Sequence, residues 1–238
     1  MVIRDIAASA YHRARYWLGL CTRIGGVQTT ARKFRAGTGY GGCVCSMESM
    51  GPESVVYSVG TGEDLSFDLA IIERFGCAVH GFDPTPKAVA WVAKQSLPPR
   101  FRFHPIGMGS YDGTAEFFLP ANPAHVSGSV VRHPGGGLER VAVELRTLAS
   151  IMRQLGHRRV DMLKLDIEGA EYDVIDQICA THAAGEGVPV SQLLVEFHHR
   201  FFPDGADRTR RAIDRLNQRG FSVFDISAND VQYAFIKR

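Results

Sequence analysis

The segment 160–172 constrains the fold more than any other part of the chain. Its first six residues, Val160–Leu165, form a short and largely apolar run of the kind found in buried strands. Three carboxylates and a glycine follow at once, and apolar residues then recur at helical spacing from Tyr172, which predicts a helix that begins near Ile167 or Glu168. A strand that ends in carboxylates just before a helix is typical of the carboxyl edge of a parallel sheet, where open α/β folds bind ligands.

The three carboxylates, Asp166, Glu168 and Glu171, are not equivalent. An acid in the first turn of a helix complements the helix dipole, and this capping role is our interpretation of Glu171. Asp166 ends a buried apolar strand, where an unpaired charge is costly, so we expect it to have a partner or a ligand.

From residue 54 onward, strands and helices alternate regularly. The patterns predict strands at 55–59, 78–82, 101–104 and 192–197, and helices at 67–75, 87–95, 148–155 and 209–218. Residues 112–148 break the alternation and predict a β-hairpin insertion, with strands at 114–119 and 140–144 around a loop at 120–139. Strands at 221–226 and 231–236 flank Asn229-Asp230 and predict a C-terminal antiparallel hairpin. The expected fold is therefore α/β, with a doubly wound, mostly parallel, Rossmann-like sheet of seven strands.

We expect two parts along the chain. Residues 1–50 carry seven Lys and Arg against two acids and contain an amphipathic pattern at 2–20, followed by a Gly-rich loop or lid at 22–42. A helix at 2–20 would pack on the domain or on a partner subunit of a homo-oligomer, and a membrane-surface helix is the alternative. Residues 51–238 form the second part, a single domain.

Composition narrows the functional classes. A net charge of +2 does not suggest a nucleic-acid groove, and no run of apolar residues is long enough to span a membrane. No secretory signal is expected at the start, and the five scattered cysteines then predict free thiols in a reducing compartment, so we expect a cytoplasmic protein.

Polar groups follow three of the predicted strands. These are the glycine-rich turn Gly60–Asp64, the acid at Asp83 and the carboxylates from Asp166. A glycine turn lets the backbone approach a ligand, and an acid about 20 residues later can accept hydrogen bonds from a ribose, so the tips predict a nucleoside site. NAD fits poorly, because Leu65 stands where a dinucleotide fingerprint has its third glycine and two acids would repel a pyrophosphate. The sulfonium of S-adenosylmethionine (SAM) fits better.

Four motifs carry a resemblance to a known family. They are Ser58–Phe67, Phe82–Pro86, Lys164–Glu171 and Glu196–His199, and together they resemble the FkbM family of SAM-dependent methyltransferases and related methyltransferase-like proteins over about residues 51–238. The resemblance implies a class I methyltransferase fold and methyl transfer, usually to a hydroxyl group of a sugar, glycoconjugate or secondary metabolite.

The resemblance also assigns expected roles to single residues. Gly60 and Gly62 would face the methionine part of SAM, Asp83 the ribose, Gly107 and Met108 the adenine, and Asp166 the sulfonium, with Glu168 beside it. Many relatives have an acid where Ser58 stands, so the SAM amino group would be held by Glu63, Asp64 or Asp166.

Methylation of a hydroxyl needs a base or a cation. Our first hypothesis is that His198 is the general base and that Glu196 orients it or the acceptor. The second is a divalent metal, Mg²⁺ or Mn²⁺, held by Asp166 and Glu196 with Glu168 or His198. A structural pair hydrogen-bonded to backbone is the alternative for His198 and His199. His125 and Ser129 of the insertion, together with His199, are candidates for contact with a small-molecule or carbohydrate acceptor.

Three other functions are less well supported by the sequence. A Rossmann-type NAD-dependent oxidoreductase or epimerase is disfavoured by the missing third glycine and by the lack of a Tyr-x-x-x-Lys pattern. A non-catalytic SAM-binding module is disfavoured because every expected polar strand tip is present. A nucleic-acid methyltransferase is disfavoured by the low net charge and by the lack of an Asn/Asp-Pro-Pro-Tyr strand tip.

Overall fold

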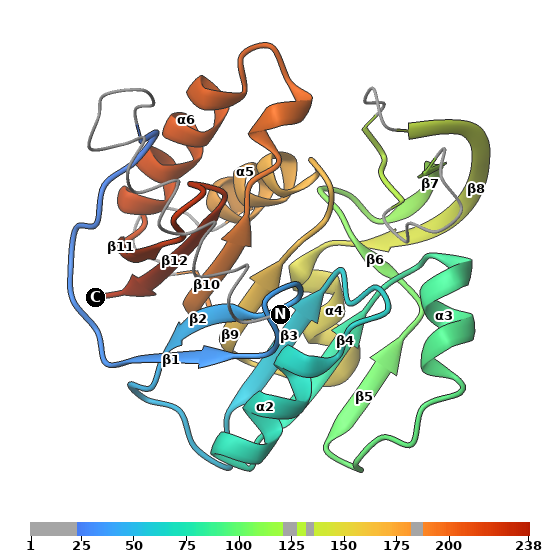
Figure 1. The fold of residues 1–238 in the computed structure, drawn as a ribbon, viewed down its shortest axis with the longest axis horizontal. Helices are drawn as coiled ribbons and strands as arrows, with labels where there is room; N and C mark the ends of the chain where they lie inside the picture. The colour runs from blue at the N-terminus through green and yellow to red at the C-terminus, as the bar shows by residue number, and fades with distance from the viewer. Residues whose placement is uncertain (1–22, 121–127, 132–135, 182–187) are drawn as a thin grey trace.

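A seven-stranded sheet forms the centre of the molecule (Figure 1). The structure is a computed structural model that describes residues 23–120, 128–131, 136–181 and 188–238. The strand order is β11-β12-β10-β9-β3-β4-β5, and the pairs from β10 to β5 are parallel. The strands are β3 (Val55–Val59), β4 (Ala78–Phe82), β5 (Phe101–His104), β9 (Val160–Leu165), β10 (Val190–Glu196), β11 (Phe221–Ile226) and β12 (Gln232–Lys237). β12 pairs antiparallel with both β10 and β11, which confirms the predicted doubly wound sheet with a C-terminal hairpin.

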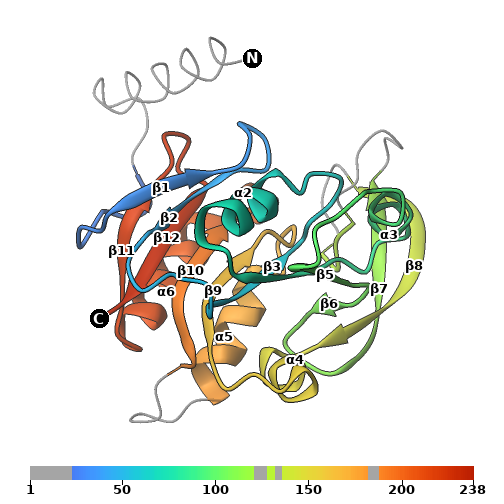
Figure 2. The same ribbon diagram turned by 90° about the horizontal axis from the view of Figure 1, so that it is seen from below.

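Helices cover both faces of this sheet (Figure 2). α2 (Ser66–Phe75) and α3 (Pro86–Val92) lie on one face, and α4 (Leu148–Leu155), α5 (Glu171–Thr181) and α6 (Gly205–Asn217) lie on the other. Because helices bury both faces, central strands can be apolar at successive positions, and β9 is buried at all six of its residues. Gly76 ends α2 in the left-handed conformation, as its position after the apolar pattern predicts.

The N-terminal segment contributes two strands that the sequence patterns do not predict. β1 (Lys33–Ala36) and β2 (Cys43–Ser46) pair with each other antiparallel and cover the α2 face of the sheet. Gln192 of β10 holds them there, because its side chain accepts from the Ser46 backbone N–H and donates to the Ser46 carbonyl. Strands of four residues carry little periodicity, and this pairing depends on a residue nearly 150 positions away. The helix predicted at 2–20 lies outside the described residues.

The predicted insertion is a small sheet of its own. β7 (Gly113–Pro120) and β8 (Gly136–Arg146) form an antiparallel pair, and β6 (Gly107–Met108) joins β8 in parallel. The hairpin is confirmed, although both strands extend further into the expected loop at 120–139. Residues 121–127 and 132–135 of that loop are not described.

α5 begins later than predicted, at Glu171 rather than near residue 167. Glu168 and Gly169 have φ angles of 51° and 100°, so the chain makes a left-handed turn before the helix can start. The cysteines at 43, 45, 77 and 179 are buried free thiols, while Cys21 lies outside the described residues. None of the described helices is long and apolar enough to cross a membrane.

Candidate active site

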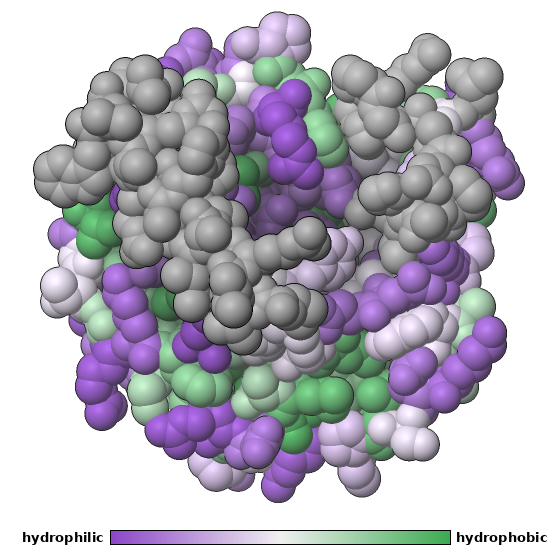
Figure 3. Space-filling view, viewed as in Figure 1, coloured by the Kyte–Doolittle hydropathy of each residue, from purple (hydrophilic) through white to green (hydrophobic). Residues whose placement is uncertain are grey.

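A cavity of about 1510 Å³ opens at the carboxyl ends of β3, β4, β9 and β10. The insertion and the segment before β2 complete its wall, with Tyr40 and Gly41 on one side and β6 to β8 on the other. In the space-filling view this region is a hydrophilic hollow near the upper middle of the molecule (Figure 3). The predicted strand tips therefore meet at one edge, because parallel strands place their carboxyl ends together.

The turn after β3 needs a glycine at position 60. Gly60 has φ 83°, and a Cβ atom there would lie 1.7 Å from the carbonyl oxygen of Asp166. The Gly60 backbone N–H donates to the carbonyl of Phe82, and the N–H of Asp166 donates to the carbonyl of Val59. The glycine thus lets the tips of β3, β4 and β9 come together on the cavity floor.

Asp83 ties this turn to the tip of β4. One carboxylate oxygen accepts from the backbone N–H of Gly62, at 2.9 Å, and the other accepts from the backbone and hydroxyl of Thr85, at 2.9 and 2.6 Å. Burial raises the pKa of this carboxyl group. Asp83 lines the cavity beside the glycine turn, as a ribose-binding acid would.

The acids of the glycine-rich turn also reach the cavity, but each already has a partner. Glu63 lies 3.5 Å from the ammonium of Lys87. Asp64 accepts from the hydroxyl of Thr38 and from the backbone N–H of Ser66, each at 2.8 Å. Through Thr38, Asp64 fastens the segment that carries Tyr40 to the cavity wall.

Of the residues predicted to contact the cofactor, Gly107 and Met108 reach the cavity, whereas Ser58 does not. Gly107 and Met108 of β6 line the cavity on the insertion side, consistent with the expected adenine contact. Ser58 is completely buried in the middle of β3 and lies beneath the cavity rather than on its surface. Its hydroxyl faces the buried carboxyl of Asp68 on α2, so a direct contact between Ser58 and a cofactor is not supported.

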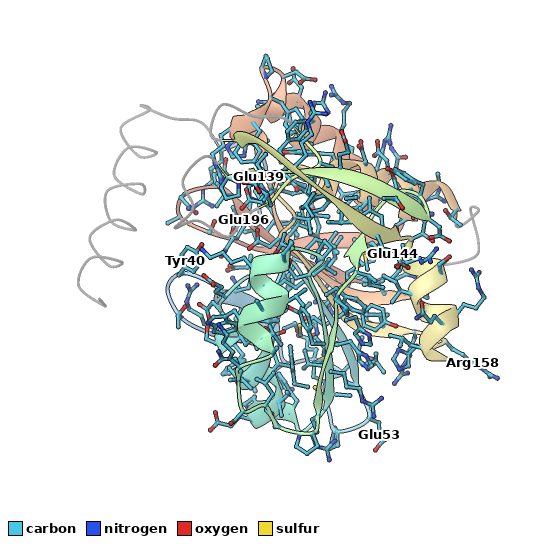
Figure 4. The ribbon with its side chains drawn as sticks, turned by 90° about the vertical axis from the view of Figure 1, so that its right-hand side faces the viewer. Tyr40, Glu53, Glu139, Glu144, Arg158 and Glu196 are labelled. Carbon is cyan, nitrogen blue, oxygen red and sulfur yellow. The ribbon has the colours of Figure 1, made fainter. Side chains whose placement is uncertain are left out.

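Asp166 and Glu196 lie side by side at the ends of β9 and β10. Both line the cavity, with side chains 28% and 23% exposed. Burial raises the pKa of each carboxyl group, and the charge of Asp166 raises that of Glu196 further. The amide of Gln232 donates to Glu196 at 3.0 Å. Figure 4 shows Glu196 and Tyr40, which contribute to this cavity from opposite ends of the chain.

His198 is surrounded by carboxylates below the cavity surface. It is 1% exposed, and its Nε2 atom lies 3.2 Å from Glu168, 3.7 Å from Asp166 and 4.0 Å from Glu196. Burial alone would lower its pKa, but Glu171, Glu168 and Asp166 together raise the pKa of His198 to about 9. At neutral pH the ring is a cation and has no free lone pair for a substrate proton. The structure therefore argues against His198 as the general base.

Glu171 does more than cap α5. Its side chain is fully buried, and one oxygen accepts from the backbone N–H of Gly169 at 2.8 Å, as a cap would. The other oxygen accepts from the backbone N–H of His198 at 2.7 Å, and its edge faces Nδ1 of the same ring at 3.4 Å. Glu171 thus joins the segments after β9 and β10 and places a negative charge beside the His198 ring.

The two described candidates for acceptor contact, Ser129 and His199, do not line the cavity. His125 lies outside the described residues. Ser129 is fully buried, and its hydroxyl donates to the carbonyl of Glu168 at 2.5 Å, so it anchors the insertion to the carboxylate turn. His199 begins a short 3-10 helix, η1 (His199–Phe201), and does not line the cavity.

One cluster among the described residues has the arrangement of a metal site. Ligand atoms of Asp166, Glu196 and His198 lie within 4.8 Å of one another. Two carboxylates suit Mg²⁺ or Mn²⁺. The imidazole suits them less well here, because its Nε2 already faces Glu168 and carries a proton at neutral pH. The donor set therefore fits a divalent cation through its carboxylates rather than through His198.

Among the cavity residues that the sequence patterns missed are Tyr40, Lys164 and Arg200. Lys164 was visible as the one charged residue inside the apolar part of β9 after Asp161. The only sequence feature that marks Tyr40 is its place in the Gly-rich segment. Arg200 cannot be distinguished in the sequence from an ordinary charged surface residue.

A family model and two similar proteins all point to methyltransferases. The model of the "Methyltransferase FkbM domain" matches residues 54–223, which is more than half of the chain. Human "Probable methyltransferase-like protein 24" is 26% identical over 178 residues, covering 71% of this chain and 41% of the relative. The rat protein of that name is 25% identical over 143 residues, covering 60% and 32%. The chain thus spans less than half the length of these relatives.

A solved structure with a similar chain path is a Methanococcus jannaschii fibrillarin, described as a pre-rRNA processing protein. It has a TM-score of 0.45 and 8% identity, and the match covers 79% of this chain and 67% of that one. A similarity this low carries no argument about activity.

Proposed function

Since the chain belongs to the FkbM methyltransferase family, we propose that it transfers the methyl group of SAM to a hydroxyl group of a small-molecule or carbohydrate acceptor. The observation that carries this proposal is the charge of the cavity. Among the described residues, eight carboxylates line it: Glu63, Asp64, Asp83, Glu116, Asp166, Glu168, Asp173 and Glu196. Only two cations do so, Lys164 and Arg200. Such a wall attracts a sulfonium and repels the pyrophosphate of a dinucleotide.

The order of groups along the cavity supports the same cofactor. The adenine would lie against Gly107 and Met108, the ribose against Asp83, and the methionine part over the turn at Gly60 and Gly62. The sulfonium would then face Asp166. Each group of SAM has a chemically suitable neighbour, and the acceptor can enter from the side of β10, where Glu196 lies.

We place proton removal on the carboxylates rather than on His198. The acceptor oxygen attacks the methyl carbon in line with the carbon–sulfur bond, so the C–O bond forms as the C–S bond breaks and S-adenosylhomocysteine leaves. The hydroxyl proton passes to Glu196 or Asp166, whose raised pKa values make them better bases near neutral pH. The cationic ring of His198 holds the carboxylates in place.

A divalent metal is the second candidate for activating the hydroxyl. Asp166 and Glu196 would hold it, with His198 joining only after losing its proton. Such a cation would lower the pKa of a bound hydroxyl group.

A cytoplasmic location, assembly into a homo-oligomer and a boundary between two parts of the chain at residue 50 remain predictions.

Calorimetry followed by a turnover assay tests the proposal. We expect SAM and S-adenosylhomocysteine to bind and NAD not to bind. Formation of S-adenosylhomocysteine should then be followed by mass spectrometry with pools of sugars, glycoconjugates and secondary metabolites as acceptors. Binding of NAD but not SAM would refute the proposal, whereas binding of SAM without turnover on any pool would favour a non-catalytic SAM-binding module.

A further inference from the structure

Lys164 is an unusual residue for its position. It belongs to the fully buried strand β9 and is only 8% exposed, yet it forms part of the cavity wall. A buried ammonium is costly unless it meets an anion.

The carboxylates near Lys164 lie too far from its ammonium group to use all of its hydrogen-bond donors. Among the described residues, the only carboxylate oxygen within 4.0 Å of Nζ belongs to Asp166, at 3.9 Å, which is beyond hydrogen-bond distance. The buried carboxyl of Asp68 is also near, but its Oδ1 atom has no hydrogen-bond partner. The ammonium has three donors, so it can still donate to a ligand.

The side chain is also held in place. Its Nζ lies 5.5 Å from the centre of the Phe67 ring, which packs against it from α2. In the sheet, Lys164 pairs with Ser58 of β3, two residues before Gly60. The ammonium therefore lies below the glycine turn, on the cavity floor, where the methionine part of SAM would lie under the proposed function.

That part of SAM carries charges of both signs. The eight carboxylates of the wall suit its sulfonium and its ammonium, but they repel its carboxylate. The carboxylate needs a cation, and the only other one on the described wall is Arg200. Arg200 is exposed on η1, and its guanidinium lies 4.9 Å from the centre of the Phe201 ring.

We infer that Lys164 binds the carboxylate of the methionine part of SAM and so selects SAM over ligands that lack this group. The inference rests on the proposed function. Phe67 packs against the Lys164 side chain, the nearby carboxylates of Asp68 and Asp166 offset its buried charge, and other carboxylates of the wall hold the cationic end of the same ligand. Lys164 would then orient the methyl group toward Glu196 by fixing the far end of the cofactor.

The test compares SAM with decarboxylated SAM, which has the same sulfonium and amine but no carboxylate. Binding of both to the whole chain is measured by calorimetry. We expect the wild type to prefer SAM by roughly 10- to 100-fold, as for a hydrogen bond between charged groups. In Lys164→Met, SAM affinity should fall by about the same factor while the affinity for decarboxylated SAM stays the same or rises, because a repulsive cation is gone.

Two further variants keep the result interpretable. Arg200→Met removes the other cation of the wall and should leave the preference for SAM unchanged. Lys164→Met alone leaves Asp68 without its neighbour, so the double variant Asp68→Asn/Lys164→Met, which removes both buried charges, is measured beside Asp68→Asn. The preference should survive in Asp68→Asn and be lost in the double variant.

The outcomes separate the two proposals. If the wild type binds neither SAM nor S-adenosylhomocysteine, the proposed function fails, and this inference fails with it. If SAM binds but Lys164→Met and the double variant weaken both ligands equally, only the inference about Lys164 is overturned. Loss of the preference in Arg200→Met instead would assign the carboxylate to Arg200.

Discussion

Gly60 and Asp166 lie so close that no side chain could stand between them, because a Cβ atom on Gly60 would be 1.7 Å from the carbonyl oxygen of Asp166. One residue belongs to the turn after β3 and the other directly follows β9, more than 100 positions later. Their contact closes the floor of the cavity. Because only glycine fits at position 60, this contact also determines where the carboxylate of Asp166 lies.

Gly60→Ala should therefore disrupt both stability and ligand binding. The added methyl group meets backbone atoms, which cannot rotate away, and φ of 83° is unfavourable for alanine. We expect a loss of about 3 kcal/mol or more in the free energy of unfolding and no measurable SAM binding. The control is Gly51→Ala, where nothing lies within 4 Å of the added atom. Equal unfolding midpoints for the two variants would contradict the contact.

Glu171→Gln should destabilise the link between β9 and β10. Both carboxylate oxygens accept backbone N–H groups, and an amide can replace only one of them. The buried His198 cation also loses the charge of the carboxylate that faces its Nδ1 atom at 3.4 Å. We expect a loss of about 2–4 kcal/mol in urea unfolding. Glu53→Gln, at an exposed position, should unfold like the wild type.

The His198 ring should remain protonated well above neutral pH. Its pKa of about 9 exceeds the ordinary value of 6.5, so its pairing contributes stability fully below pH 6.5 and loses that contribution as pH rises toward 9. An NMR titration of the ring should show a midpoint near 9, and methyl transfer should show no activation step near pH 6.5. A midpoint near 6.5 in NMR would restore His198 as a candidate base.

A cluster of three histidines, His80, His104 and His157, should make the protein sensitive to acid. His80 is buried; its Nδ1 lies 3.0 Å from Nε2 of His104, and its ring contacts that of His157. Burial lowers the pKa of His80 to about 4, so the unfolded chain binds more protons between pH 6.5 and 4. Stability should fall across that window by up to ~3 kcal/mol from His80. His80→Gln should reduce this slope, measured as urea midpoints against pH; an unchanged slope would place the effect elsewhere.

Removal of divalent ions distinguishes the two ways of activating the acceptor. If the carboxylates act directly, a chelator should leave turnover unchanged, and Glu196→Gln should lower kcat by roughly 10²–10⁴-fold with little change in SAM affinity. Loss of turnover with the chelator, restored by Mg²⁺ or Mn²⁺, would instead support a metal held by Asp166 and Glu196.

Several features of the site could be predicted because they are local in the sequence. A strand that ends in polar residues before a helix determines where those residues lie in a parallel sheet. Gly60, Asp83 and Asp166 therefore share one cavity, as predicted, although they are far apart in the chain. The bounds predicted for β9 and α4 match the observed ones for the same reason, since β9 is a largely apolar run and α4 has a strong helical apolar periodicity.

The chemical state of the site could not be predicted in this way. His198 follows β10 and looks like a base at a strand tip, but the fold surrounds it with Glu168, Glu171 and Asp166 and so keeps it charged. Lys164 looks like an interruption of a buried strand until the fold places it beneath the glycine turn. In this protein the sequence alone determined most of the strands and helices from β3 onward and which ends of the strands carry polar groups, but not the pairing of β1 with β2. Only the tertiary structure decided which of those groups are buried, which are paired and which can reach a ligand, because burial and charge depend on neighbours contributed by distant segments.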